Sequence, residues 1–324
     1  MTTKPKVGFY WCASCGGCEE TVVDLDEKVL DVVAAVDIVF WPCAMDFKYT
    51  DVEAMADGEM AACFINGAIR TEEQEHVAKL LRKKSAAVIA FGSCACMGGI
   101  PALANLTSRE AIMRRSYISS PTVGSEGGST VPQKSTDVGS VNLQLPELYD
   151  SVLKLDDVID VDYYLPGCPP TPELLATAVG ALLSGELPPA KSVLLPDKAL
   201  CASCDRNSSK PDNLTVAGLK RVYQVKADPE KCFLAQGILC MGPATRDGCG
   251  YPCVKGNMPC TGCFGPMSGG DQGARMTAAL GGIIDVGEAA LDEALAGIPD
   301  PAGSFYRYSM SASLLGRVRK GEPS

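Results

Sequence analysis

The stretch Ala86-Ala87-Val88-Ile89-Ala90-Phe91-Gly92-Ser93-Cys94 decides the fold class of this 324-residue chain. It is apolar from Ala86 to Phe91, which is the pattern of a strand in a parallel sheet whose two faces are both covered. It then passes through Gly92 into a turn that carries a cysteine. The stretch therefore predicts a buried strand with a reactive loop at its carboxyl end.

Similar short apolar segments occur at residues 6–11, 36–41, 61–67 and 161–165. Helical patterns lie between or after them at residues 19–33, 72–84, 172–183 and, with a weaker pattern, 145–155. Strands that alternate with helices indicate an α/β fold with a doubly wound parallel sheet.

Cysteines follow three of these five strands. Cys15 and Cys18 come after the first strand, Cys94 after the fourth and Cys168 after the fifth. Ligands of open α/β sheets bind beyond the carboxyl ends of the strands. We therefore expect these four thiolates to converge on one iron–sulfur cluster.

A second set of eight cysteines occupies the C-terminal part of the chain, where the regular periodicity fades. Its members are Cys201, Cys204, Cys232, Cys240, Cys249, Cys253, Cys260 and Cys263. Eight thiols are the number that two four-iron clusters need. A Gly- and Pro-containing stretch near 183–195 predicts a boundary, with domains at 1–190 and 191–324. The C-terminal domain is expected to be mostly irregular.

The pairs Cys201/Cys204 and Cys260/Cys263 also have zinc-knuckle spacing. The twelve candidate thiols, in three sets of four, and the many Gly and Pro residues around them favour iron–sulfur clusters over zinc. A zinc-stapled binding module is the alternative, and it would be colourless.

The bulk composition excludes several classes of protein. The net charge of −10 argues against nucleic-acid binding. No apolar run reaches the roughly 18 residues of a membrane span, and residues 1–6 show no export signal, so we expect a cytoplasmic protein. In a reducing compartment the 16 cysteines indicate metal or redox chemistry more than disulfides. The single histidine, His76, lies in a polar helical run and is expected to be solvated.

Four cysteines are left over. Cys63 lies inside a predicted strand and Cys43 follows another, so both are interpreted as packing residues. Spacing alone leaves Cys12 and Cys96 open as ligands.

Among the other segments, residues 101–141 predict a long loop that either contacts a partner or forms a surface excursion. Residues 269–274 predict a turn leading into a helix at 274–279.

The tail, residues 305–324, is expected either to dock on a partner or to be solvated. It carries Arg307, Arg317, Arg319 and Lys320.

Taken together, the motifs resemble those of nickel–iron hydrogenase small subunits over nearly the whole chain. Cys15-Gly16-Gly17-Cys18-Glu19-Glu20 looks like that family's Cys-x-Gly-Cys-x-Glu motif. The segments 92–99, 167–170, 240–249 and 259–263 resemble its Gly-x-Cys-Ala-x-x-Gly-Gly, Gly-Cys-Pro-Pro, Cys-Lys-Gly-Pro-x-Thr…Cys and Pro-Cys-x-Gly-Cys motifs.

The resemblance implies a flavodoxin-like N-terminal domain and three 4Fe–4S clusters. It assigns Cys15, Cys18, Cys94 and Cys168 to the proximal cluster and makes Cys12 and Cys96 non-ligands. The implied distal set is Cys201, Cys204, Cys232 and Cys240, and the implied medial set is Cys249, Cys253, Cys260 and Cys263.

Three departures from the common family pattern suggest the cytoplasmic branch. Cys201 stands where many members have histidine, Cys253 stands where many have proline, and an export signal is missing. The length and the middle loop favour the viologen-reducing type linked to heterodisulfide reductase, in an anaerobic, methanogenic context. Small subunits of deazaflavin-coenzyme-reducing hydrogenases are the alternative within this branch.

The resemblance further implies a separate large subunit that carries the nickel–iron centre, and an electron-accepting iron–sulfur or flavin subunit. No side chain of this chain is expected to be catalytic. Glu20 is a candidate for proton transfer or for a hydrogen bond across the interface, and equally for a carboxylate at a helix N-terminus.

A non-enzymatic multi-cluster electron carrier is a rival interpretation from another class of protein. The related respiratory quinone-reductase subunit is a third candidate, but it lacks the C-terminal eight cysteines and carries adjacent cysteines that are absent here.

Overall fold

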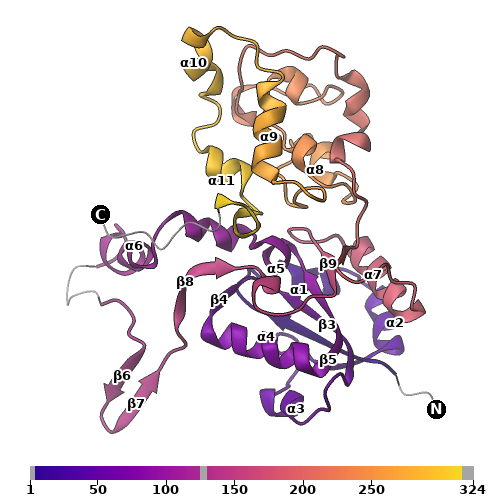
Figure 1. The fold of residues 1–324 in the computed structure, drawn as a ribbon, viewed down its shortest axis with the longest axis vertical. Helices are drawn as coiled ribbons and strands as arrows, with labels where there is room; N and C mark the ends of the chain where they lie inside the picture. The colour runs from indigo at the N-terminus through magenta and orange to yellow at the C-terminus, as the bar shows by residue number, and fades with distance from the viewer. Residues whose placement is uncertain (1–3, 125–129, 316–324) are drawn as a thin grey trace.

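A six-stranded sheet, parallel throughout, forms the N-terminal half of the protein (Figure 1). The computed structural model describes residues 4–124 and 130–315. The strand order is β10-β9-β5-β3-β1-β2. The bounds are β1 Lys6–Trp11, β2 Asp37–Phe40, β3 Met60–Asn66, β5 Ser85–Phe91, β9 Tyr163–Leu165 and β10 Ser192–Val193. The predicted doubly wound α/β fold is confirmed, and all five predicted strands are present.

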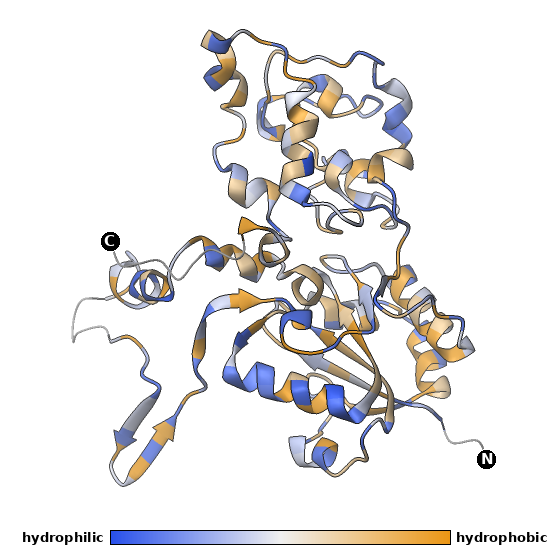
Figure 2. Cartoon of the chain, viewed as in Figure 1, coloured by the Kyte–Doolittle hydropathy of each residue, from blue (hydrophilic) through white to orange (hydrophobic). Residues whose placement is uncertain are grey.

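Helices cover both faces of this sheet. On one face lie α3 (Tyr49–Glu53) and α4 (Glu72–Lys84), and on the other lie α1 (Gly17–Val23), α2 (Lys28–Ala35) and α7 (Pro172–Ser184). Each face has its own apolar core. In the core on the α1 side, the rings of Phe64 and Phe91 pack edge to face with their centroids 5.9 Å apart. Figure 2 shows the hydrophobic colouring concentrated on the strands and on the inward side of the helices.

The sequence of α4 explains why it begins and ends where it does. The Thr71 hydroxyl accepts a hydrogen bond from Gln74 N, and Gln74 Oε1 accepts one from Thr71 N, which is a capping box. Acidic residues fill its first turn and basic residues its last turn, as the helix dipole favours. His76 lies on its exposed side, as predicted.

Two helix predictions were wrong. Residues 145–155 contain the strand β8 (Leu148–Leu153), which pairs antiparallel with β4 (Ile69–Thr71). The predicted helix at 19–33 is two helices, α1 and α2, separated by a turn in which Asp26 has a positive φ of 52°. In both segments the apolar spacing fits a helix, but tertiary contacts decide the outcome.

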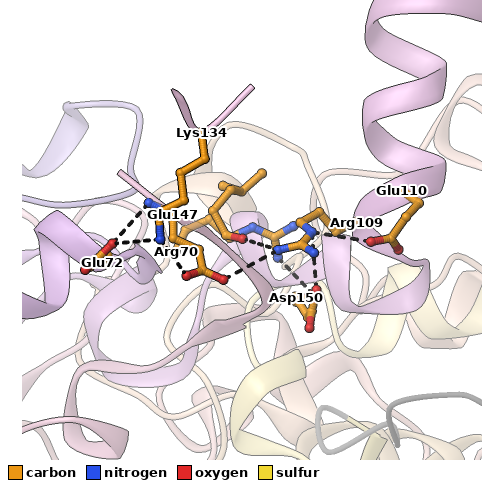
Figure 3. Close-up of polar contacts among 8 residues, drawn as sticks. Arg70, Glu72, Arg109, Glu110, Lys134, Glu147 and Asp150 are labelled. Carbon is orange, nitrogen blue, oxygen red and sulfur yellow. Dashed lines mark hydrogen bonds and ion pairs between the residues drawn. The ribbon is translucent and has the colours of Figure 1, made fainter. Parts of the chain in front are cut away.

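The described part of the predicted 101–141 loop contains regular structure. Helix α5 (Ser93–Met97) is followed by a 3₁₀ helix (Ile100–Leu106) and then by α6 (Arg109–Arg114). The antiparallel strands β6 (Ser135–Val138) and β7 (Val141–Gln144) form an arm that projects from the body (Figure 1). Charged side chains hold its base, where Lys134 lies 3.2 Å from Glu147 and Arg109 lies 3.3 Å from Asp150 (Figure 3).

The C-terminal half is mostly irregular, as predicted. Its helices are short: α8 Pro252–Lys255, α9 Gln272–Gly281, α10 Leu291–Leu295 and α11 Pro301–Phe305. The predicted turn before α9 is present, with Asp271 capping the helix by accepting a hydrogen bond from Ala274 N. The edge strand β10 joins the first sheet just beyond residue 190.

The segment from Phe305 to Ser313 is packed against the rest of the protein. The expectation that the tail is solvated was therefore wrong for this segment. Met310 is fully buried against Ala68, Ala102 and Val152 of the N-terminal half. Ser311 Oγ also donates a hydrogen bond of 2.7 Å to Val152 O. Arg317, Arg319 and Lys320 lie outside the described residues. Across residues 4–124 and 130–315, no helix is both long enough and apolar enough to cross a membrane.

Candidate metal centres

The structure brings Cys15, Cys18, Cys94 and Cys168 together at the carboxyl edge of the sheet. They come from the segments after β1, β5 and β9, as the sequence predicts. Burial, followed by the charges of Cys168 and Cys15, raises the pKa of the Cys94 thiol to about 12. Burial, followed by the charges of Cys94, Cys168 and Cys15, also raises the pKa of Cys18. Clustered thiols whose ionisation is opposed by burial and by neighbouring thiols, as at Cys18 and Cys94, are a donor set suited to iron, whose positive charge stabilises thiolates.

Two glycines keep this edge open. A Cβ on Gly92 would lie 2.2 Å from Cys18 Sγ, and one on Gly99 would lie 2.4 Å from Cys94 Sγ. Both residues also have positive φ values, 85° and 58°. The glycines of the Gly-x-Cys-Ala-x-x-Gly-Gly segment therefore leave the space that a cluster requires.

The edge opens to the protein surface at one point. Cys15 is exposed, whereas Cys18 is buried. Beside Cys15, the ring of Trp11 is 41% exposed and lies 3.2 Å from where a Cβ on Gly16 would stand. The first cysteine group is therefore accessible from the protein surface on this side.

A second group of four cysteines surrounds a cavity in the C-terminal half. Cys201, Cys204, Cys232 and Cys240 line a cavity of about 30 Å³ together with apolar residues such as Phe233 and Val254. Burial, together with the charges of Cys240, Cys232 and Cys204, raises the pKa of Cys201 to about 12. This group matches the set that the resemblance implies for the distal cluster.

The remaining four cysteines line a larger cavity between the two halves. Cys249, Cys253, Cys260 and Cys263 share this cavity of about 270 Å³ with Cys168 of the first group. Burial, together with the charges of Cys249, Cys168 and Cys253, raises the pKa of Cys263 to about 12. Tyr251 N donates a hydrogen bond of 3.3 Å to Cys249 Sγ, a contact that favours a thiolate.

The three groups follow one another through the molecule. Cys168 links the first to the third by lining the third group's cavity. Ser93 strengthens this link, because its hydroxyl donates to Cys263 O and accepts from Gly167 N at 3.0 Å. The third group meets the second where Met241 N donates to Cys260 O at 2.9 Å. The order is therefore the Cys15 edge, then the 249–263 group, then the 201–240 group.

The four other cysteines lie outside these groups. Cys63 is fully buried in β3, as predicted, and Cys12 packs in the same core. Cys96 is buried and its thiol donates a 3.2 Å hydrogen bond to Ala90 O. Cys43 is exposed, so its interpretation as a packing residue was wrong. The adjacent Trp41 occupies the core position after β2 instead.

Sequence reasoning singled out Glu20 but missed Glu19. Glu20 is exposed on α1, whereas Glu19 is 7% exposed and buried beside Cys18. Burial raises the pKa of Glu19, and hydrogen bonds from Trp41 and Asn66 lower it. Helical spacing could have found it, since Glu19 is three residues before the buried Val22 and shares its face.

Within the described residues, no three His, Cys, Asp or Glu side chains stand close enough to hold a single metal ion. The cysteine groups are instead spread around cavities, as the larger core of an iron–sulfur cluster requires. The donor set, the cavities and the glycines that a Cβ would fill all fit such clusters.

Comparisons with known proteins agree with this geometry. Residues 15–182 match a protein-family model described as "NADH ubiquinone oxidoreductase, 20 Kd subunit". Over 316 residues the chain is 39% identical to an iron–sulfur subunit of the F420-non-reducing hydrogenase of Archaeoglobus profundus, covering 96% of this chain and 98% of that protein. It is 37% identical to the corresponding F420-non-reducing hydrogenase subunit of Methanothermobacter thermautotrophicus, over 97% of each chain.

A solved structure shares the fold. The recombinant [NiFeSe] hydrogenase from Desulfovibrio vulgaris Hildenborough, in the oxidised state, gives a TM-score of 0.53 at 18% identity. The match covers 82% of this chain and 95% of that one.

Proposed function

The chain belongs to the family of nickel–iron hydrogenase small subunits, and we propose that it carries electrons through three 4Fe–4S clusters between a large subunit and an acceptor protein. It is a subunit of an oxidoreductase whose active site lies on another chain. The single observation that carries the proposal is the continuous series of three four-cysteine groups, which runs from the exposed Cys15 edge to Cys201.

The proposed ligands are the three groups described above. Cys15, Cys18, Cys94 and Cys168 hold the proximal cluster, Cys249, Cys253, Cys260 and Cys263 the medial one, and Cys201, Cys204, Cys232 and Cys240 the distal one. When bound, each cluster supplies one-electron transfer. The protein holds the clusters in sequence and sets their potentials through burial, hydrogen bonds to sulfur and nearby charge.

The large subunit is proposed to cover the proximal edge, where Cys15 and Trp11 are exposed. We infer that this interface is obligate and larger than the standard ~1,600 Å². Glu20, exposed on α1 at the same edge, is placed to contact that subunit. A location in the cytoplasm is part of the same proposal.

The acceptor is proposed to be an iron–sulfur or flavin subunit linked to heterodisulfide reductase. The full-length relatives carry "F420-non-reducing" in their names, which supports this type over one that reduces the deazaflavin coenzyme F420. In the anaerobically purified complex, dihydrogen-dependent reduction of F420 by this hydrogenase would favour the alternative.

Iron and sulfide analysis with EPR after dithionite reduction tests the proposal. Three 4Fe–4S clusters require about twelve irons per chain. About eleven irons with a signal from an oxidised three-iron cluster would remove Cys253 from the medial set. Zinc without iron would refute electron transfer, and full iron in a chain that never copurifies with a large subunit would indicate a free electron carrier.

A further inference from the structure

The β6–β7 arm has no part in the function described so far, yet its two faces differ sharply in chemistry. The strands pair in register around the turn at Gly139, so residues two apart in a strand lie on the same face. One face carries four apolar side chains: Val138, Val141, Leu143 and Leu145. The other face carries four polar side chains: Ser135, Asp137, Asn142 and Gln144. Such alternation is typical of an antiparallel sheet with one face in a core and the other in water.

The polar face is already satisfied within the arm. Asn142 Nδ2 donates hydrogen bonds of 2.9 Å to Ser135 Oγ and 2.8 Å to Asp137 Oδ1. Gln144 Nε2 donates one of 3.2 Å to Asn142 Oδ1. The apolar face is uncovered, since its four side chains are between 54% and 58% exposed. An isolated two-stranded hairpin is at best marginally stable in water, so the apolar face is the side of the arm that needs a partner.

A second copy of the arm is too small to be that partner. Four half-exposed Val and Leu side chains offer roughly 200 Å² of apolar area. Two arms stacked face to face would bury roughly 400 Å², well below the about 1,200 Å² at which stable specific interfaces begin. The arm therefore fits an addition to an interface that other surfaces already form.

The base of the arm is joined to the edge that carries Cys15. Strand β8, which follows the arm, pairs with β4, and β4 begins just after Ala68. Ala68 exchanges two hydrogen bonds of 2.9 Å with Ala13, two residues before Cys15. Val152 of β8 and Ala68 share a small core, and Cys94 packs against it. The arm therefore grows from the structure that holds the first cysteine group.

Exposed apolar side chains also occur between this edge and the arm. The 3₁₀ helix after α5 begins at Ile100 and ends at Leu106, and both side chains are about half exposed. Asn105 anchors this helix to β8, because its side chain exchanges hydrogen bonds of 2.8 and 3.0 Å with the backbone of Val152. Apolar side chains are thus exposed at Trp11, at both ends of this helix and on the arm.

We propose that the β6–β7 arm is a clamp that lays its apolar face on the hydrogenase large subunit. It extends the interface at the Cys15 edge, so the two contacts belong to one binding event and the arm slows dissociation. The inference rests on the proposed function, since it takes the large subunit as the protein that covers that edge. Figure 1 shows the arm standing away from the sheet and its helices, where it can reach a neighbouring chain.

Photo-crosslinking in the anaerobically purified hydrogenase complex identifies what covers the arm. The photoreactive amino acid p-benzoylphenylalanine replaces Val141 on the apolar face or, as the matched control, Asn142 on the polar face. Both residues are exposed and lie in the same strand, so the two positions differ mainly in the face they occupy. After illumination, mass spectrometry should show the large subunit attached at position 141 and loss of that attachment when the probe is moved to position 142.

A second measurement asks whether the contact contributes to binding. Leu143→Ser removes apolar area from the arm, whereas Gln144→Ser shortens a side chain of the polar face. Each variant is followed as it washes off a tagged large subunit. Leu143→Ser should dissociate faster, on the order of tenfold, and Gln144→Ser should dissociate at the wild-type rate. Both variants should keep about twelve irons per small subunit, because the arm carries no cysteine.

Each outcome decides the inference. Cross-links from position 141 to the large subunit, together with faster loss of Leu143→Ser, support it. Cross-links to a second copy of the chain, to the acceptor subunit or to no other chain overturn it, as do equal yields from the two faces. Leu143→Ser dissociating at the wild-type rate overturns the clamp role. A wild-type chain that is loaded with iron but never copurifies with a large subunit refutes the proposed function, and the inference with it.

Discussion

The two halves of the molecule hold their cysteine groups in opposite ways. In the N-terminal half, two apolar cores pack against the sheet, and of the four proximal cysteines Cys18 alone belongs to one of them. In the C-terminal half, Cys260 belongs to the hydrophobic core, and Cys232, Cys240 and Cys249 pack against it. The first half specifies its fold by apolar burial and then adds a site. In the second half, most of the cysteines lie in or against the core.

The largest predicted effect follows from cluster removal. Stripping iron with an oxidant and chelator should leave the sheet folded but unfold the region from about residue 200 to 300, because its short helices and irregular segments are held together around the cysteine groups. Limited proteolysis followed by mass spectrometry should show complete loss of protection there and continued protection of β1, β3 and β5. Equal loss of protection in both halves would contradict the comparison.

The second prediction concerns the glycine that makes room at the proximal edge. Gly99 has φ 58° and ψ −158°, a backbone region almost exclusive to glycine. A Cβ there would also lie 2.7 Å from Cys94 Cα. Gly99→Ala should cost about 3 kcal/mol or more and displace Cys94, so the chain should lose about four irons.

Gly58→Ala is the matched control for Gly99→Ala. Gly58 has a similar φ of 73°, but no atom lies within 4 Å of the position that a Cβ would take there. This variant should cost only about 1–2 kcal/mol and keep all its iron. Full iron content in Gly99→Ala would show that the edge can rearrange around the added methyl group.

The third prediction tests the independence of the sheet from the clusters. Leu81 is fully buried where α4 packs on the sheet. Leu81→Ala should destabilise the N-terminal half by about 2–5 kcal/mol through lost burial and a cavity. Amide hydrogen exchange should accelerate in α4, β3 and β5, while the region around Cys232 and Cys240 keeps wild-type protection. Faster exchange in both halves would show that they unfold as one unit.

The same contrast explains how far the sequence could predict this structure. Local apolar patterns identified β1, β2, β3, β5 and β9, and those strands placed Cys15, Cys18, Cys94 and Cys168 at one edge. The patterns failed where a distant partner decides the outcome. Residues 148–153 form a strand because β4 is available to pair with them.

The C-terminal region shows the limit of local patterns more clearly. Its motifs predicted which cysteines group together, because their spacing resembles that of known small subunits. They did not predict that residues 308–313 return to pack on the first half, since no periodicity marks a segment whose partners are Ala68, Ala102 and Val152. Glu19 was missed because the next residue, Glu20, has the same side chain. The two differ only in that Glu19 lies on the buried face of α1, together with Val22.

The smallest predicted effect concerns the β6–β7 arm, which has neither an apolar core nor a cysteine group. Lys134 at its base lies 3.2 Å from Glu147 and 3.8 Å from Glu72, and the three side chains are 64%, 50% and 59% exposed (Figure 3). Exposed pairs of this kind contribute little, so Lys134→Ala should cost at most about 0.5–1 kcal/mol at low salt. Chemical unfolding by urea should show the difference shrinking as added NaCl shortens the screening length.

Arg109→Ala serves as the comparison for Lys134→Ala. Arg109 is less exposed, at 33%, and its Nη1 donates a hydrogen bond of 2.8 Å to Leu148 O besides the ion pair to Asp150. Its loss should therefore be larger and persist in high salt, because a hydrogen bond to a backbone carbonyl is screened less than a pair of exposed charges. If Lys134→Ala were the costlier and salt-insensitive variant, the base of the arm would behave as a third core, and the division of stability between apolar burial and cysteine sites would not describe the whole chain.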